Sequence, residues 1–423
     1  MNSSEVREID YRDVANGQPT PWKIVMWGSA VDAKLLEKIQ NRFPALEHFE
    51  QNKTLIVSQG PEFIDGGVAT EETTELHEEL VGKRTILADE VKGRRFLYRF
   101  PSSALRSLEP VDVFVSRRGG VKRKLSVCHP PHIIVGASRN FAVYTEEFLV
   151  VPSRQIGIVS PTGDQRFLRA LTLYLNSDFV AYHQFLTATE SGVQKTRGTL
   201  ESLRKLPVPF EHDKAADDWE ALYLRILREI AGRDDFDRPD LVRDLNELTF
   251  DALKLPSRAR AAVHDLVHVR FGLTRGKTAP SAVNPPGKSE ITAYAETLRD
   301  DLDSFVGTAA DARHRVEIMV GGGSGLIAVS LVWGVRRREP VQTWDASDDD
   351  ARRLLEARTH LIEQRSQWLY FNRNLRVYDG LGTYILKPLQ HLHWTRTQAI
   401  QDAGEIIADS LRSRPPVPAD GVY

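Results

Sequence analysis

The chain has 423 residues, enough for two or three domains of ordinary size. Its net charge is −2 with 27% charged residues, so any nucleic-acid-binding surface must be a local patch. The single cysteine, Cys128, excludes an internal disulfide framework, and the longest apolar run, residues 326–333, is too short to span a membrane. Because residues 1–10 are polar and acidic and do not resemble a signal peptide, we expect a cytoplasmic protein with no membrane partner.

Residues 1–210 predict short strands and turns with a few helices. Apolar runs at 111–115 and 133–137 predict strands. A short apolar helix follows and runs into Leu175-Asn176-Ser177-Asp178, and a second helix begins there. A polar loop then leads to a stop at Leu206-Pro207-Val208-Pro209.

This order resembles the target-recognition region of N6-adenine DNA methyltransferases from restriction-modification systems. The resemblance covers roughly residues 1–275. Pro21-Trp22-Lys23-Ile24 and Trp27-Gly28-Ser29 are similar to the segment that joins catalysis to recognition in that family. The resemblance implies a strand-rich region and a Leu-Asn-Ser helix that together read a DNA sequence.

The catalytic motif of that family is missing from the chain. N6-adenine methyltransferases place a polar residue before Pro-Pro and an aromatic residue after it, so that the flipped adenine is hydrogen-bonded and stacked. Asn284-Pro285-Pro286 comes nearest, but Gly287 follows and offers no ring. The glycine cluster at 321–325 lies between two strand-like runs, so we interpret it as a hairpin turn rather than a phosphate-binding loop. We therefore predict no catalytic residue and no cofactor.

Three local stretches supply the candidate DNA contacts. The first stretch, residues 117–124, could anchor phosphates or be a solvated hairpin tip. The second, residues 139–140, has side chains that suit guanine and adenine edges, although Asn140 suits a plain turn equally. The third, residues 194–197, could contact phosphates or bases, or be a flexible loop between Gly192 and Gly198. The predicted DNA-binding residues are Arg117, Arg118, Lys122, Arg123 and Lys124; Arg139 and Asn140; and Lys195, Thr196 and Arg197.

Apolar spacing changes after Phe210. Residues 217–271 predict three helices, of which the first has one apolar face formed by Trp219, Leu222, Tyr223, Ile226, Leu227 and Ile230. Breakers then predict a linker. We expect an α+β protein with a target-recognition-like domain at 1–210, a helical segment at 211–275, a linker at 276–289 and a smaller α+β domain at 290–423.

The last third of the chain predicts a helix at 291–305, strands on both sides of the glycine cluster, two more strands around Tyr378-Asp379-Gly380, and a final helix at 394–411 that begins at Thr395 or Thr397. Arg373, Arg376 and Lys387 could meet DNA or a partner subunit, or be ordinary exposed charges on strands.

Metal binding is not indicated by the sequence. Cys128, His129 and His132 lie close together, but no second cysteine or partner pair stands at ligand spacing. The acids at 347–350 precede a helix, where they favour its N-terminus. We interpret these groups as structural and predict no metal.

The sequence leaves alternative functions open. The first is a non-catalytic DNA specificity subunit that positions a separate N6-adenine methyltransferase on double-stranded DNA, with a nuclease or translocase as a further candidate partner. The second is a DNA-cleaving or modifying defence enzyme with a site in the C-terminal domain. The third is a split C-terminal part of a longer methyltransferase.

Overall fold

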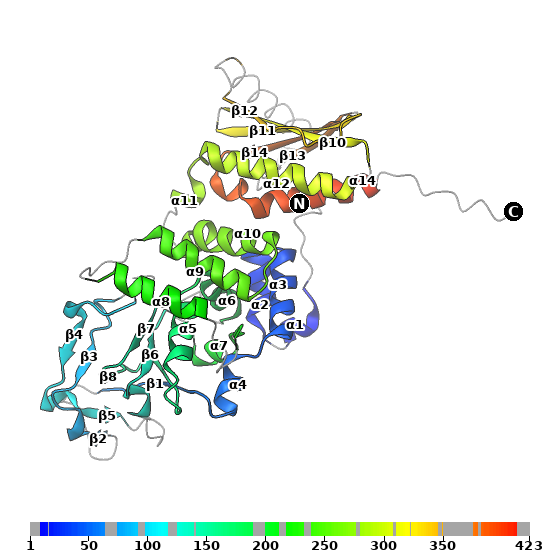
Figure 1. The fold of residues 1–423 in the computed structure, drawn as a ribbon. Coiled ribbons are helices and arrows are strands. Elements are labelled where there is room, and N and C mark those ends of the chain that lie inside the picture. Colours follow the sequence, from blue (N-terminus) through cyan, green and yellow to red (C-terminus); the bar gives the residue numbers. More distant parts are fainter. Residues whose placement is uncertain are drawn as a thin grey trace, which may run out of the picture. The chain divides into compact units, whose positions relative to one another are not determined.

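The structure is a computed structural model with an α+β fold, as predicted. The chain divides into two compact units, an N-terminal unit, Ile9–Pro256, and a C-terminal unit, Ser257–Tyr423 (Figure 1). The boundary falls within residues 211–275, where the sequence predicts a separate helical segment. The described residues are 9–15, 17–63, 74–91, 98–116, 125–138, 141–188, 199–210, 217–231, 238–275, 280–307, 310–321, 323–345, 349, 375–379 and 382–412.

The N-terminal unit is more helical at its start than the sequence suggested, because four helices occupy much of residues 11–51. Its α-helices are α1 (Tyr11–Ala15), α2 (Pro19–Trp27), α3 (Ala30–Arg42), α4 (Leu46–Gln51), α5 (Gln165–Leu175), α6 (Asp178–Thr187), α7 (Leu200–Arg204), α8 (Asp217–Glu229) and α9 (Pro239–Ala252). Short 3₁₀ turns lie at Glu78–Leu80, Ser102–Ala104, Pro110–Asp112 and Leu125–Cys128.

Short strands form three small sheets in the N-terminal unit. An antiparallel sheet has the order β1-β9-β6-β7, a second has the order β4-β3-β8, and β2 pairs with β5. All residues of β6 and β9 are buried, which explains why they read as unbroken apolar runs rather than as alternating patterns. The strands are β1 (Ile56–Gln59), β2 (Thr74–Leu76), β3 (Arg84–Ile86), β4 (Leu105–Ser107), β5 (Phe114–Ser116), β6 (His132–Val135), β7 (Ala142–Thr145), β8 (Leu149–Val150) and β9 (Ile156–Val159).

Helix α5 forms the centre of the N-terminal unit. It begins at Asp164, whose carboxylate accepts a hydrogen bond from the Phe167 amide at 3.0 Å, and it packs against β6 and β7. Helix α8 packs on α5 with the apolar face that its sequence predicts, since Trp219 and Ile226 are buried. The hydroxyl of Tyr174 donates to the Pro207 carbonyl, so the Pro-rich stop after α7 is tied to this core.

The C-terminal unit is a five-stranded sheet with helices on one face. Helices α12 and α14 lie side by side along the sheet (Figure 1). Its helices are α10 (Ser257–Asp265), which continues through a π-helical turn (Leu266–Arg270) and a 3₁₀ turn (Phe271–Arg275), α11 (Pro280–Val283), α12 (Lys288–Val306), a 3₁₀ turn (His391–His393) and α14 (Arg396–Arg412). Its strands are β10 (Ala312–Gly321), β11 (Ser324–Trp333), β12 (Gln342–Asp345), β13 (Leu375–Asp379) and β14 (Gly382–Pro388), in the order β12-β10-β11-β14-β13.

Two local features of the C-terminal unit were predicted correctly from the sequence, namely the hairpin turn at the glycine cluster and the start of the last helix. Strands β10 and β11 pair antiparallel up to Gly321 and Ser324, which confirms the hairpin turn at the glycine cluster. Gly323 has a φ of +74°, a conformation that favours glycine. The Thr395 hydroxyl accepts a hydrogen bond from the Gln398 amide at 3.2 Å, so the last helix begins where the sequence predicts. Residues 280–283, expected in a linker, instead form α11 with Ala282 fully buried.

Candidate nucleic-acid interface

All ten predicted DNA-binding residues lie outside the described residues. They fall in three segments: 117–124, which contains Arg117, Arg118, Lys122, Arg123 and Lys124; 139–140, which is Arg139 and Asn140; and 189–198, which contains Lys195, Thr196 and Arg197. The described elements on either side of each segment determine where it leaves the fold. Segment 117–124 joins β5 to the turn Leu125–Cys128, segment 139–140 joins β6 to β7, and segment 189–198 joins α6 to α7.

The side chain of Asn176 holds the start of β7, just after segment 139–140. The Gly136 amide donates to the Phe141 carbonyl at 3.0 Å, so the polar backbone groups of the next residue, Ala142, point away from β6. Asn176 pairs with both of them. Its Oδ1 accepts from the Ala142 amide at 3.1 Å and its Nδ2 donates to the Ala142 carbonyl at 2.7 Å. The Asn176 side chain therefore forms, at the free edge of the sheet, the two hydrogen bonds that a neighbouring strand would otherwise form with Ala142.

Close packing also fixes the β6 side of this turn. A Cβ atom on Gly136 would lie 2.7 Å from Cε1 of the Phe141 ring and 2.9 Å from two further ring atoms. Only glycine permits this approach. The Phe141 ring is in turn met edge-on by Phe100, with the ring centroids 6.1 Å apart. Gly136 and Phe141, on either side of residues 139–140, are thus held by close packing and by a backbone hydrogen bond.

The other residues of the Leu175–Asp178 motif are also structural. The Ser177 hydroxyl caps α6 by accepting from the Val180 amide at 3.4 Å. The Asp178 carboxylate accepts from Nδ2 of Asn246 in α9, and the Asp178 amide donates to Oδ1 of Asn246, both at 2.8 Å. Asn176, Ser177 and Asp178 are all buried. The motif therefore aligns α5, α6, α9 and the β7 edge, and its polar groups face the protein interior.

The helices on either side of segment 189–198, α6 and α7, are joined by hydrogen bonds. Near the end of α6, Gln184 Nε2 donates to the Ser202 carbonyl in α7 at 3.0 Å, and the Ser202 hydroxyl donates back to Gln184 Oε1 at 3.0 Å. Thr199 caps α7 by accepting from the Ser202 amide at 3.1 Å. Two reciprocal hydrogen bonds therefore join the residues that precede the segment in α6 to those that follow it in α7.

Lys23 holds the end of α6 from which this loop departs. Its ammonium group donates to the Phe185 carbonyl at 2.7 Å and to the Ala188 carbonyl, so a buried cation satisfies the C-terminal carbonyls of α6. Burial lowers the pKa of Lys23 to about 8. The ring of Trp27 meets the Phe185 ring edge-on, with centroids 6.5 Å apart.

A second link joins α3 to α6. The Tyr182 hydroxyl donates to Asp32 Oδ1 at 2.7 Å, and the other carboxylate oxygen accepts from the Ser29 amide at 2.6 Å and the Ser29 hydroxyl at 2.8 Å. Residues 21–29 and 171–210, two of the stretches on which the sequence resemblance rests, are far apart in sequence. Lys23, Trp27 and the Ser29–Asp32–Tyr182 chain bring them together.

The side of segment 117–124 that leads into the core is anchored by the turn Leu125–Cys128. Val127 packs so tightly on Gly157 of β9 that a Cβ atom there would lie 2.7 Å from both Cβ and the carbonyl oxygen of Val127. Burial raises the pKa of the Cys128 thiol to about 11, so Cys128 is a protonated core residue at neutral pH.

His132 likewise serves the core. Its Nδ1 lies 2.6 Å from the Val127 carbonyl, and burial lowers its pKa to about 4, so the ring is neutral at pH 7 and Nδ1 donates to the carbonyl. Within the described part of the chain, no group of three or more His, Cys, Asp or Glu side chains is arranged to hold a metal ion.

Two strand charges of the C-terminal unit, Lys387 and Arg376, are paired with carboxylates of α14. The Lys387 ammonium is fully buried, donates to Asp402 and lies 4.5 Å from the centroid of the Tyr294 ring. Burial lowers the pKa of Lys387. Arg376 is paired with Glu405 and Asp409 of α14. Lys387 is therefore neither an exposed strand charge nor a residue that can meet DNA or a partner subunit, so both predictions were wrong for it. Arg373 lies outside the described residues.

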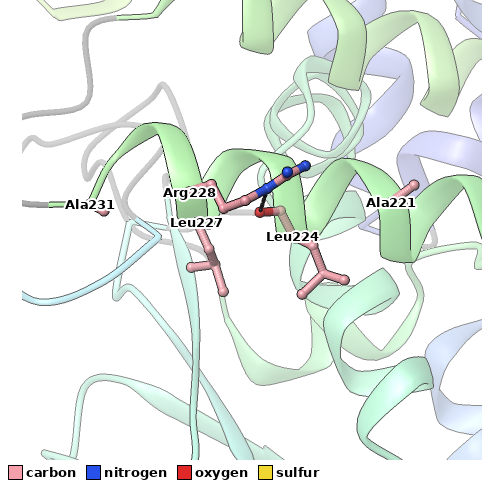
Figure 2. A pocket seen from close by; sticks show the side chains of 5 residues that line it. All are labelled: Ala221, Leu224, Leu227, Arg228 and Ala231. Atoms are coloured by element: carbon pink, nitrogen blue, oxygen red, sulfur yellow. Dashed lines mark hydrogen bonds between the residues drawn. The ribbon is translucent and has the colours of Figure 1, made fainter.

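An open hollow lies along the outer side of α8. Figure 2 shows Leu224 and Leu227 beside Arg228, with Ala221 at one end on α8 and Ala231 at the other end, just after the helix. Arg228 Nε donates to the Leu224 carbonyl at 3.4 Å. The hollow contains one charged side chain, and it offers no convergent set of polar groups of the kind that small-molecule sites carry.

No protein-family model matches the chain, and no curated protein matches its sequence. Among the helices of the described residues, none combines the length and apolar character needed to cross a membrane. The described geometry fixes residues that flank segments 139–140 and 189–198: Asn176 binds Ala142 of β7, and Gln184 of α6 binds Ser202 of α7.

Proposed function

We propose that the chain is a non-catalytic DNA sequence-recognition subunit of a bacterial restriction-modification or phage-defence system. It positions a separate N6-adenine methyltransferase on double-stranded DNA. The observation that carries this proposal is the packing of residues 21–29 on α6. Residues 21–29 resemble the segment that joins catalysis to recognition, and α6 belongs to the stretch that resembles the target-recognition region. Buried hydrogen bonds from Lys23 to the Phe185 carbonyl and from Tyr182 to Asp32 join the start of the chain to α6.

In the proposed mechanism, segment 117–124 anchors phosphates while Arg139, Asn140 and the loop with Lys195 read base edges. Rigid ends favour this role, because binding then orders few additional residues.

Selection of bound duplexes from a randomised pool tests the proposal. We expect one short motif to be enriched by the purified chain at moderate salt. Arg139→Ala and Asn140→Ala should each relax one position of the motif, at a cost of about 1–3 kcal/mol. The matched controls are Arg154→Ala and Asn41→Ala, which change exposed residues elsewhere in the N-terminal unit and should leave the motif unchanged. Retention without any enriched motif would contradict sequence reading.

The non-catalytic part of the proposal has its own test. The chain is incubated with the enriched duplex and radiolabelled S-adenosylmethionine, alone and with Mg²⁺. We expect neither methyl transfer nor strand cleavage above the rate of a blank without protein. Methyl transfer by the chain alone would refute the assignment to a specificity subunit, and Mg²⁺-dependent cleavage would identify a nuclease instead.

A further inference from the structure

A basic corner of the C-terminal unit carries an exposed tryptophan next to three exposed arginines. Strand β11 ends at Trp333, which is 67% exposed, and Gly334 then turns the chain with a φ of +77°. Arg336, Arg337 and Arg338 follow in an exposed loop. We call Trp333 and these three residues the arginine corner.

The backbone of the arginine corner is fixed on both sides. The Gly334 amide donates to the Asp311 carbonyl at 2.8 Å, and Arg299 of α12 donates to the Glu339 carbonyl at 2.8 Å. Arg336 Nε donates to Asp311 Oδ1 at 3.0 Å, and Arg338 donates to Asp300 Oδ2 at 2.9 Å. The loop is therefore shaped before any ligand binds.

The arginines of the corner remain available to an anion. The Arg336 side chain is 86% exposed and that of Arg338 is 61% exposed, and ion pairs this exposed contribute little stability and exchange readily. Arg337 lies between them without an ion pair or hydrogen bond to any described residue. The three guanidinium groups follow one another along a fixed loop, an arrangement that suits a row of phosphates.

Neighbouring arginines add to the positive charge of the arginine corner. Three more arginines, Arg299, Arg313 and Arg315, lie in the elements that support the loop. Together with the three arginines of the corner they make six, and within the described chain only three carboxylates pair with them: Asp300, Asp311 and Glu339. The neighbouring acids Asp301 and Asp303 of α12 are paired with Arg258 and His314. The corner thus carries an excess of positive charge although the whole chain is slightly acidic.

We propose that the arginine corner is a second DNA contact, which binds the sugar–phosphate backbone outside the sequence read by the N-terminal unit. Arg336, Arg337 and Arg338 contact phosphates, and Trp333 packs against a sugar or an unstacked base. The choice of DNA as the anion rests on the proposed function. The contact itself carries no sequence information, so it adds affinity and not specificity.

Salt dependence of binding by the full chain tests this proposal. Dissociation constants are measured for wild type, Arg337→Gln and the triple variant Arg336→Gln/Arg337→Gln/Arg338→Gln, on the duplex enriched by selection and on a scrambled duplex. Each lost phosphate contact lowers the slope of log K against log[salt] by about 0.9. We expect the slope to fall by about 1 in Arg337→Gln and by about 2–3 in the triple variant, equally on both duplexes. Trp333→Ala should weaken binding with little change of slope, and Trp333→Phe should restore most of it.

The control triple variant, Arg154→Gln/Arg228→Gln/Arg243→Gln, removes the same charge from exposed positions that do not form such a loop. If both triple variants change the slope equally, or neither does, the arginine corner is not a DNA contact, whatever motif the chain selects. If the slope falls only in the corner variant but no motif is enriched, the corner binds DNA and the proposed sequence reading fails. If wild type binds no DNA at low salt, both proposals fail.

Discussion

Replacing Asn176 should destabilise the N-terminal unit and loosen the hairpin that presents Arg139 and Asn140. In Asn176→Ala, the buried Ala142 amide and carbonyl both lose their partner, whereas the Thr172 carbonyl keeps its bond from the Asn176 backbone amide at 3.3 Å. A buried backbone group left without a hydrogen bond costs about 1–3 kcal/mol. The expected loss is therefore about 2–6 kcal/mol in the free energy of unfolding.

Two measurements check this effect. Urea unfolding reports the free energy, and hydrogen exchange of the 141–145 backbone reports the local change, because the Ala142 amide should exchange far faster in the variant. Asn41→Ala, on the exposed side of α3, serves as the control and should change stability by less than about 0.5 kcal/mol. If Asn176→Ala matched Asn41→Ala in both measurements, the role of Asn176 as a substitute strand would be wrong.

Three further variants probe other parts of the fold. Gly136→Ala should cost about 1–3 kcal/mol, since the new methyl group meets the Phe141 ring, and thermal unfolding measures this loss. Lys387→Met should cost about 3–5 kcal/mol because it leaves a buried Asp402 charge without its cation, and Lys387→Met/Asp402→Leu should cost less than the sum of the two single changes. Burial lowers the pKa of His183 to about 3, so the unfolded chain takes up this proton below about pH 6.5 while the folded chain does not. Stability should therefore fall by about 1.4 kcal/mol per pH unit as pH drops from 6.5 towards 3, and His183→Phe should remove that part of the slope.

Controls make these expectations refutable. Gly404→Ala in α14 meets nothing within 4 Å and should raise stability by about 0.5–1 kcal/mol, so a gain of that size in Gly136→Ala would contradict the close packing on Phe141. Strict additivity in the Lys387 and Asp402 cycle would show that the pair does not interact. An unchanged pH slope in His183→Phe would show that His183 is not a buried neutral base.

Much of the fold was predictable because its signals are local. The apolar spacing of α8, the glycine turn between β10 and β11, and the start of α14 at Thr395 each depend on a few neighbouring residues. The helical start of the chain was underestimated. Residues 11–51 contain short helices, of which α2 packs on α6 and α4 packs on α7, and a sequence window does not display such contacts.

Buried polar residues were the hardest to predict. Lys387 stands on a strand and reads as an exposed charge, yet it pairs with Asp402 on the last helix. Lys23 is similar, because the carbonyls that it caps lie more than 160 residues away. Asn176 could be recognised as part of a motif, but its partner, the free edge of β7, depends on the register of β6 and β7. Such contacts depend on tertiary structure and leave no periodic signal.

The most direct test of the central claim is the ratio of dissociation constants for the enriched duplex and a scrambled duplex of equal length, measured at one fixed salt concentration. Specific sites are typically bound at least about 10³-fold more tightly than non-specific DNA. We predict a ratio of this order for wild type and a fall of about 5- to 150-fold in Asn140→Ala, the equivalent of about 1–3 kcal/mol, with no change in Asn41→Ala. A wild-type ratio near 1 would contradict sequence recognition by this chain.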